Sequence, residues 1–473
     1  MSDTGTLDAF RDVLGEGGVL ATADLTERYL VDQRALLRGE TAAVLRPRTP
    51  EEVQATVRLA RQHGYGLVPQ AGNTSYVGGA TPDLSGRQLV VSLERMTRIR
   101  EVDAAGFTLS ADAGVILADA QAAAESHGLL LPLSLGAEGS CRLGGNLGTN
   151  AGGLNVLRYG MARDQVLGIE VVLPDGALFS DMRPLRKHNV GYDLKQLFIG
   201  GEGTLGIVTG VVLKLSPRPV SHATAWVQIA DAAALPDMLG EVRRESCDLV
   251  SSFEFITRTS LDLVSAIGLG DTKLRTGTGG AVIIELSASS ERVPLDEMMG
   301  AIIEAMMEKG WVEDAFLAQS GQQRLDMWRL RESIPEGEKY AGGSVKLDIS
   351  VPLSRLWDFL REGEAVVRAH DPALRLSVYG HVGDGNIHYN ILVPEGADRL
   401  AFTDAVNAGL AHELYALARS LGGDYSAEYG IGRLKRDLLE RYSEPVRLDL
   451  MRRLKGALDP DNLMNAGAMV DPA

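Results

Sequence analysis

The sequence predicts an α+β fold in more than one domain, and three observations lead to this prediction. With 473 residues, the chain can supply the cores of about two or three domains. Amphipathic helical patterns and short β-branched runs both recur along it. Pro217 and Pro219 separate a first part with long glycine-rich loops from a second part in which strands and helices alternate.

The elements of the first part follow from local signals. Short helical patterns fill residues 1–42, and Thr49 with Pro50 opens a helix that ends at His63-Gly64. Strands are expected at 67–69, 89–93 and 108–114, a helix at 116–127, a hairpin at 168–176 and a strand from 207. This part therefore mixes both element types around its loops.

The second part reads as an antiparallel sheet of ferredoxin-like type, because its strands and amphipathic helices alternate. Its expected elements are strands at 226–230, 252–256, 281–288 and 345–352, helices at 232–244, 258–267, 295–309, 353–369 and 398–421, and a hairpin around 379–390. A tail of loop and helix, 424–473, closes the chain.

Composition excludes several classes of protein. Lys and Arg total 47 against 63 Asp and Glu, so the net charge of −16 argues against a nucleic-acid partner. The two cysteines, Cys141 and Cys247, are too few for a disulfide scaffold. The first residues lack the pattern of a signal peptide, and no apolar run can span a bilayer. We expect a cytoplasmic protein, peripheral to a membrane at most through an electron acceptor.

Two histidines flank the turn of the predicted hairpin. His381 and His388 stand on either side of Gly383-Asp384-Gly385-Asn386, whose residues suit a tight turn. Such a turn can bring both imidazoles to one face. With one carboxylate they would form a three-ligand metal site with an open position. The alternative is a packed or hydrogen-bonded pair of strand residues.

Glycine loops suggest a phosphate-bearing ligand. Gly201–Gly206 matches GxGxxG, but a strand follows it where a dinucleotide-binding fingerprint requires a helix, so we reject a Rossmann domain. The loops PQAGNTSYVGG (69–79) and LGAEGSCRLGGNLGTNAGG (135–153) could instead converge backbone N–H groups on a pyrophosphate and approach a flat ring closely. Plain turns remain the alternative from the residues alone.

Five ordered motifs make the chain resemble a known family. PQAGNTSYVGGATP, GAEGSCRLGGNLGTNAGGLNVLRYG, GYDLKQLFIGGEGTLGIVT, GHVGDGNIHYN and SAEYGIG resemble the D-2-hydroxyglutarate dehydrogenases of the vanillyl-alcohol-oxidase (PCMH-type) superfamily. D-Lactate and glycolate dehydrogenases share much of this set. The resemblance implies an FAD-binding PCMH-type domain at 43–217, a substrate (cap) domain at 218–423 and a segment at 424–473 that returns to the FAD domain.

The resemblance also assigns the cofactor site. No histidine lies within 69–79, where a covalent flavin link could sit, so we expect non-covalent FAD. The implied FAD-binding residues are Pro69, Gly72, Asn73, Thr74, Ser75, Gly136, Ser140, Gly144, Gly145, Asn146, Thr149, Asn150, Gly152, Gly203, Gly206, Ile207 and Asn465.

A substrate site is implied in the same way. Glu428 matches the family's metal-binding carboxylate, so that His381, His388 and Glu428 would hold Zn²⁺ or another divalent ion. The residues implied to touch the substrate are Arg331 and Lys346, which would bind its distal carboxylate, together with Asn390 and Tyr429, and His388 and Tyr429 would lie at the reacting end. The alternative for the two cations is a solvated Arg331 and a Lys346 paired with Asp348 or Glu332.

Two departures leave the substrate open. Tyr429 stands where the family has a histidine that is the usual candidate for general base, and a phenol with a reference pKa near 10 is a poor base at neutral pH. Pro335 stands where the hydroxyglutarate enzymes place a hydroxyl-bearing residue, and proline offers no donor. His188 is either a displaced base or a loop histidine.

The sequence thus predicts an FAD- and metal-dependent oxidation of a D-2-hydroxy acid of the D-2-hydroxyglutarate, D-malate or D-lactate type. Electrons would pass to a separate acceptor such as an electron-transfer flavoprotein, a quinone or a cytochrome, and the protein could be a homodimer. The alternatives are a flavoprotein oxidase or dehydrogenase of another hydroxylated substrate, and the flavin subunit of a complex like glycolate oxidase.

Overall fold

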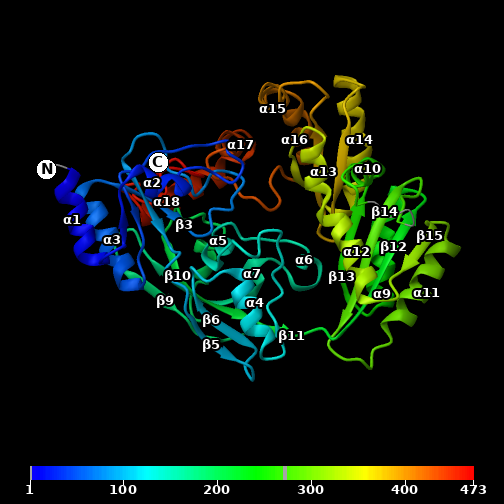
Figure 1. The fold of residues 1–473 in the computed structure, drawn as a ribbon, viewed down its shortest axis with the longest axis horizontal. Coiled ribbons are helices and arrows are strands. Elements are labelled where there is room, and N and C mark those ends of the chain that lie inside the picture. The colour runs from blue at the N-terminus through cyan, green and yellow to red at the C-terminus, as the bar shows by residue number, and fades with distance from the viewer. Residues whose placement is uncertain (1–2, 270–273) are drawn as a thin grey trace. The chain divides into compact units, whose positions relative to one another are not determined.

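The computed structural model of the chain describes residues 3–269 and 274–473 (Figure 1). The chain divides into two compact units. Unit 1 combines Met1–Gly153, Gly160–Arg218 and Glu428–Ala473, and unit 2 combines Leu154–Tyr159 with Pro219–Ala427. Helices and strands occur in both units, so the α+β prediction is confirmed.

Unit 1 contains a mainly parallel sheet in the order β1-β2-β4-β3. Its strands are β1 (Val19–Leu20), β2 (Val44–Leu45), β4 (Gln88–Ser92) and β3 (Gly66–Gln70), and the last three run parallel. Helix α3 (Pro50–His63) begins as predicted: the Thr49 side chain accepts a hydrogen bond from the N–H of Glu52, and Gly64 ends the helix at φ 68°. Helix α1 (Asp3–Leu14) packs against α3.

A second, antiparallel sheet of unit 1 has the order β5-β6-β10-β8-β9. Its strands are β5 (Ile99–Asp103), β6 (Thr108–Asp112), β10 (Ile207–Lys214), β8 (Val166–Val172) and β9 (Leu178–Asp181). Strand β10 starts directly after Gly206, which confirms that this glycine motif does not open a helix. Further elements of unit 1 are α4 (Leu117–Glu125), β7 (Leu129–Leu130), α5 (Leu143–Gly148), α7 (Ala162–Gln165), α8 (Lys195–Phe198), β11 (Ser216–Pro217), α17 (Arg436–Tyr442) and α18 (Pro445–Leu458).

Unit 2 is built on one antiparallel sheet in the order β15-β12-β14-β13-β18-β19-β16, with β17 also on β19. Strands β12 (Ser221–Ile229), β13 (Val250–Ile256), β14 (Gly280–Ala288) and β15 (Val312–Leu317) form the predicted ferredoxin-like part. The hairpin β18 (Leu376–His381) and β19 (Asn386–Leu392) extends the sheet beyond β13.

Helices of unit 2 cover this sheet. Helix α11 (Leu295–Glu308) lies along β12, β14 and β15, next to α9 (Leu235–Glu245). A core of Trp226, Ile283, Leu261, Met327 and Ile334 joins strand residues to α10 (Arg258–Ala266), α12 (Gly321–Glu332) and α13 (Ile334–Tyr340). Alternation along the strands puts Glu254, Glu285, His381 and His388 on this same face of the sheet.

Two expected elements are interrupted. The helix predicted at 398–421 is broken at Gly409 into α15 (Arg399–Ala408) and α16 (Leu410–Ser420). The strand predicted at 345–352 divides into β16 (Ser344–Val345) and β17 (Asp348–Ser350), although the carbonyl of Leu347 between them still accepts a hydrogen bond from the N–H of Tyr389 at 2.8 Å. The sequence pattern did not predict β15, α12 or α13.

Candidate active site

The histidine hairpin brings two imidazoles together. Tyr379 of β18 pairs with His388 of β19, and the ring centroids of His381 and His388 lie 5.5 Å apart, both side chains buried. Gly385 takes the left-handed conformation at φ 78°, which closes the turn between them. The predicted hairpin is thereby confirmed.

Glu428 completes a possible metal-binding set. His381, His388 and Glu428 each offer a ligand atom, and these atoms all lie within 4.8 Å of one another. The residue before Glu428 is fixed to the sheet, because the N–H of Ala427 donates to Asp348 Oδ2 at 3.0 Å and Asp348 pairs with His388. Two imidazoles and one carboxylate are the donor set of an open, catalytic zinc site, so these residues fit a divalent metal.

Burial keeps His388 in the form that a metal requires. Desolvation lowers its pKa well below the ordinary value of 6.5, and the positive charges of His381, Arg331 and Lys346 lower it further. The ring is therefore neutral near pH 7. Only a neutral imidazole nitrogen has the lone pair that binds a cation.

Glu254, which sequence analysis missed, connects the metal-binding set to a buried arginine. Its Oε1 lies 2.6 Å from His381 Nδ1, and its Oε2 accepts a hydrogen bond from Arg331 Nε at 2.8 Å. Burial alone would raise the pKa of Glu254, but the charges of His381 and Arg331 lower it to about 2. An ionised Glu254 accepts a hydrogen bond from the Nδ1–H of His381, so Nε2 of His381 is the nitrogen that can coordinate a metal.

Glu338, also missed, organises the other predicted substrate-binding residues. It is almost fully buried on α13 and accepts hydrogen bonds from Lys346 Nζ at 2.5 Å, Ser344 Oγ at 2.8 Å and Asn390 Nδ2 at 2.9 Å. Lys346 therefore pairs with Glu338 and not with Asp348 or Glu332, the partners considered from the sequence. Asn390 lies two residues after His388 on β19, on the same face, as predicted.

The positions that depart from the family pattern differ in their surroundings. Tyr429 is half-buried, with its ring 4.9 Å from that of Tyr76 and Lys435 Nζ 6.0 Å from its centre. Pro335 is exposed at the start of α13. His188 lies in a loop after β9, with its Nδ1 3.6 Å from Asp181 Oδ2, which favours the interpretation as a loop histidine.

The predicted FAD-binding loops of unit 1 are joined to one another. A Cβ on Gly72 would lie 2.5 Å from the carbonyl oxygen of Ser140, so the first two loops touch where only glycine fits. The N–H of Glu202 donates to the carbonyl of Gly148 at 2.8 Å. Asn465, fully buried, donates from Nδ2 to the carbonyls of Gly79 and Glu202, both at 2.8 Å, and so holds the first and third loops together.

These loops have the properties that an FAD site needs. Asn73 and Asn150 adopt left-handed conformations, with φ of 53° and 51°, which turn the backbone out of regular pairing. Within the described residues, the buried Oδ1 of Asn146 has no hydrogen-bond partner and can accept from a ligand. Asn150 is committed to the protein, since its Oδ1 accepts from the N–H of Arg163 at 2.9 Å.

The remaining predicted FAD-binding residues are distributed over the same loops. Gly136 and Ser140 are exposed, Gly152, Gly206 and Ile207 are buried, and the partly exposed residues are Pro69, Thr74, Ser75, Gly144, Gly145, Thr149 and Gly203. A Cβ on Gly203 would lie 2.9 Å from Pro69, so these two residues are in close contact. The residues present therefore fit a flavin dinucleotide.

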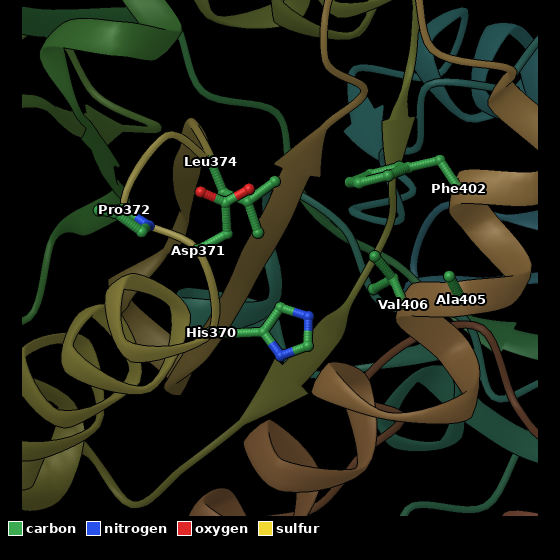
Figure 2. A pocket seen from close by; sticks show the side chains of 7 residues that line it. All are labelled: His370, Asp371, Pro372, Leu374, Phe402, Ala405 and Val406. Atoms are coloured by element: carbon green, nitrogen blue, oxygen red, sulfur yellow. The ribbon is translucent and has the colours of Figure 1, made fainter.

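A surface depression lies elsewhere in unit 2 (Figure 2). It measures about 310 Å³ between the end of α14 (Leu356–His370) and α15, and is lined by His370, Asp371, Pro372, Leu374, Phe402, Ala405 and Val406. None of the predicted site residues lines it. Among the described residues, no helix is long and apolar enough to cross a membrane.

Comparisons with known proteins agree with the geometry. The model of the FAD linked oxidases, C-terminal domain, matches residues 218–469, and that of the FAD binding domain matches residues 41–180. The chain is 36% identical over 454 residues to the mitochondrial D-2-hydroxyglutarate dehydrogenase of Bos taurus, covering 96% of this chain and 81% of the relative. It is 34% identical to the D-2-hydroxyglutarate dehydrogenase of Stutzerimonas stutzeri, covering 99% of both.

Solved structures share the fold at low identity. p-Cresol methylhydroxylase superposes with a TM-score of 0.76 at 17% identity, covering 99% of this chain and 97% of that one. At this identity the likeness concerns the fold alone, which is the predicted PCMH-type architecture.

Proposed function

Because the chain belongs to the family of FAD-linked oxidases, we propose that it oxidises a D-2-hydroxy acid to the 2-oxo acid in a metal-dependent reaction. The observation that carries this proposal is the group of His381, His388 and Glu428, with Asn390 on the same sheet face. The substrate would be of the D-2-hydroxyglutarate, D-malate or D-lactate type. Unit 1 would bind FAD, and unit 2 would supply most of the substrate site.

Each residue has a task in this reaction. His381, His388 and Glu428 would hold a divalent ion such as Zn²⁺, whose charge would polarise the substrate hydroxyl. Glu254 orients His381 through Nδ1 and pairs with Arg331. Asn390 would contact the substrate, and its orientation is fixed by Glu338. These contacts would position the Cα–H for transfer.

FAD supplies the redox chemistry when it is bound, by accepting the hydride at N5. The loops of unit 1 would hold it non-covalently and exclude water from the ring. The electrons would then leave for a separate acceptor, such as an electron-transfer flavoprotein, a quinone or a cytochrome.

Anaerobic flavin reduction tests the proposal. The purified yellow protein is mixed with D- and L-2-hydroxy acids, with and without a chelator, and the loss of flavin absorbance is followed. We expect reduction by a D-acid and slower reduction after chelation. Reduction by L-acids alone would refute the stereochemical part, and oxygen consumption with peroxide release would indicate an oxidase.

A histidine variant tests the metal. We expect His381→Ala to lose both bound zinc, measured by elemental analysis, and flavin reduction, because one of the grouped ligands is gone. His370→Ala, an exposed histidine of the same unit, is the matched control and should retain both. Unchanged kinetics in His381→Ala would remove the metal from the reaction.

A further inference from the structure

Both cations predicted to recognise a second substrate carboxylate are paired with buried carboxylates of the protein. Arg331 Nε lies 2.8 Å from Glu254 Oε2, and the side chains of the pair are 8% and 2% exposed. Lys346 Nζ lies 2.5 Å from Glu338 Oε2, with 25% and 1% of the side chains exposed. The charges of these four groups therefore cancel before any substrate enters.

Cancelled charges change what the site can bind. A cation attracts a second anionic group strongly only where its own charge is not already matched in the same low-dielectric surroundings. A carboxylate that approached Lys346 would also approach Glu338, and like charges at that distance repel. The pairing thus disfavours a distal carboxylate and leaves room for a neutral end.

Glu338 also determines which group of Asn390 faces a ligand. Asn390 Nδ2 donates to Glu338 Oε1 at 2.9 Å, so the amide has a fixed orientation. Its Oδ1 is buried and has no hydrogen-bond partner within residues 3–269 and 274–473. The amide therefore offers an acceptor to a substrate donor such as a hydroxyl, and a carboxylate, which cannot donate, gains nothing from this oxygen.

We propose that Glu338 is a specificity-determining residue that, by neutralising Lys346 and orienting Asn390, selects D-2-hydroxy acids with an uncharged distal end over dicarboxylic ones. The inference rests on the proposed function and narrows its substrate class. It agrees with Pro335, which offers no donor at the start of the same helix. Glu338 acts through Lys346 and Asn390, so it is a positioning residue.

Matched pairs of substrates test the predicted preference for an uncharged distal end on the wild-type holoenzyme. D-2-Hydroxyglutarate is compared with D-2-hydroxypentanoate, and D-malate with D-2-hydroxybutyrate, since each pair differs in the terminal carboxylate at equal carbon number. Anaerobic flavin reduction gives kcat/KM for each acid. We expect the uncharged member to be favoured by at least about tenfold in both pairs, roughly the effect of one lost charge-assisted contact. A preference of similar size for the dicarboxylic members would overturn the inference.

Glu338→Gln removes the charge while keeping the shape of the side chain. We expect it to shift the ratio of kcat/KM toward the dicarboxylic member by about tenfold or more, mainly through KM, because Lys346 is then unmatched. Glu336→Gln, an exposed glutamate on the same helix, is the control and should leave the ratio unchanged. Glu338→Asp keeps the charge and should retain the wild-type preference.

The outcomes distinguish a failure of the proposed function from a failure of the role proposed for Glu338. If no D-2-hydroxy acid reduces the wild-type flavin, the proposed function fails and this inference fails with it. If D-acids are oxidised but Glu338→Gln leaves the ratio within about twofold of wild type, the inference alone is wrong. Should Glu338→Gln not fold, the matched substrate pairs on the wild-type protein still show whether the uncharged distal end is preferred.

Discussion

Replacing Glu285 with glutamine should weaken unit 2 without touching the candidate active site. Glu285 lies on β14 with its side chain 7% exposed, and Arg324 donates to both of its oxygens at 2.7 and 2.8 Å. Thr224 Oγ1 and Trp328 Nε1 donate to Oε2, both at 2.8 Å, and His222 Nδ1 lies 3.6 Å from Oε1. The carboxylate on β14 therefore binds polar groups from both β12 and α12.

The structure sets the magnitude of the stability loss in Glu285→Gln and the pH range in which it is seen. Burial alone would raise the pKa of Glu285, but the neighbouring His222 and the hydrogen bonds and charge of Arg324 lower it from 4.5 to about 2. Such a shift corresponds to about 3 kcal/mol of unfolding free energy near pH 7. Because the folded pKa is depressed, this contribution is present above pH 4.5 and is lost as the pH falls through about 2.

Tryptophan fluorescence reports this change selectively. All four tryptophans, at positions 226, 311, 328 and 357, lie in unit 2, whereas flavin fluorescence would report unit 1. With a urea slope of about 3 kcal/mol per molar, Glu285→Gln should lower the tryptophan midpoint by about 1 M at pH 7, and by less at pH 3. Glu297→Gln, an exposed glutamate of α11, is the control. An unchanged midpoint, or a difference that does not shrink at low pH, would refute the reasoning.

Three further predictions concern buried polar groups. Burial raises the pKa of Glu202 to about 7, above the 4.5 of an unfolded chain, so unit 1 should lose stability as the pH rises between these values. On heating, the wild-type protein should therefore release flavin at a lower temperature at pH 8 than at pH 5.5. Glu202→Gln should lack this difference. Lys455→Met leaves the buried Asp459 without the ammonium at 2.5 Å, and should cost roughly 3–5 kcal/mol in the flavin-reported transition while the tryptophan signal stays. A shift of the tryptophan-reported transition without a shift of the flavin-reported one would contradict this prediction for Lys455→Met. Tyr389→Phe removes a buried hydroxyl that has no partner among the described residues, so the tryptophan-reported unfolding midpoint should stay or rise; a clear loss of stability would show that the hydroxyl is satisfied.

Local sequence patterns were sufficient to predict much of the fold and part of the candidate active site. Alternation and turn residues predicted the hairpin that brings His381 and His388 together, because both signals act over a few residues. The family resemblance supplied Glu428, which spacing could not. Gly409 was passed over, since a single glycine is tolerated within a helical pattern and only the structure shows the break.

Glu254 and Glu338 could not be assigned from the sequence because their partners depend on tertiary structure. Glu254 interrupts an apolar strand, which is a signal of a buried charge, but its partner Arg331 is 77 residues away. Glu338 lies in a short helix whose pattern does not show which side is buried, and its role follows only from the position of Asn390 across the sheet edge. Pair partners of buried charges are thus the least predictable part of the site.

The way the chain passes between the units constrains the order in which the protein can be made. Residues 154–159, which include α6 (Val156–Tyr159), belong to unit 2, where Ser252 Oγ donates to the carbonyl of Leu154. Unit 1 is completed only by the C-terminal segment, whose Asn465 N–H donates to the carbonyl of Leu67 at 2.7 Å. During synthesis, unit 2 can therefore close while unit 1 still waits for its last residues. We expect chains that end at Ala427, held on the ribosome by an added unstructured linker that fills the exit tunnel, to resist protease in unit 2 and to bind no flavin.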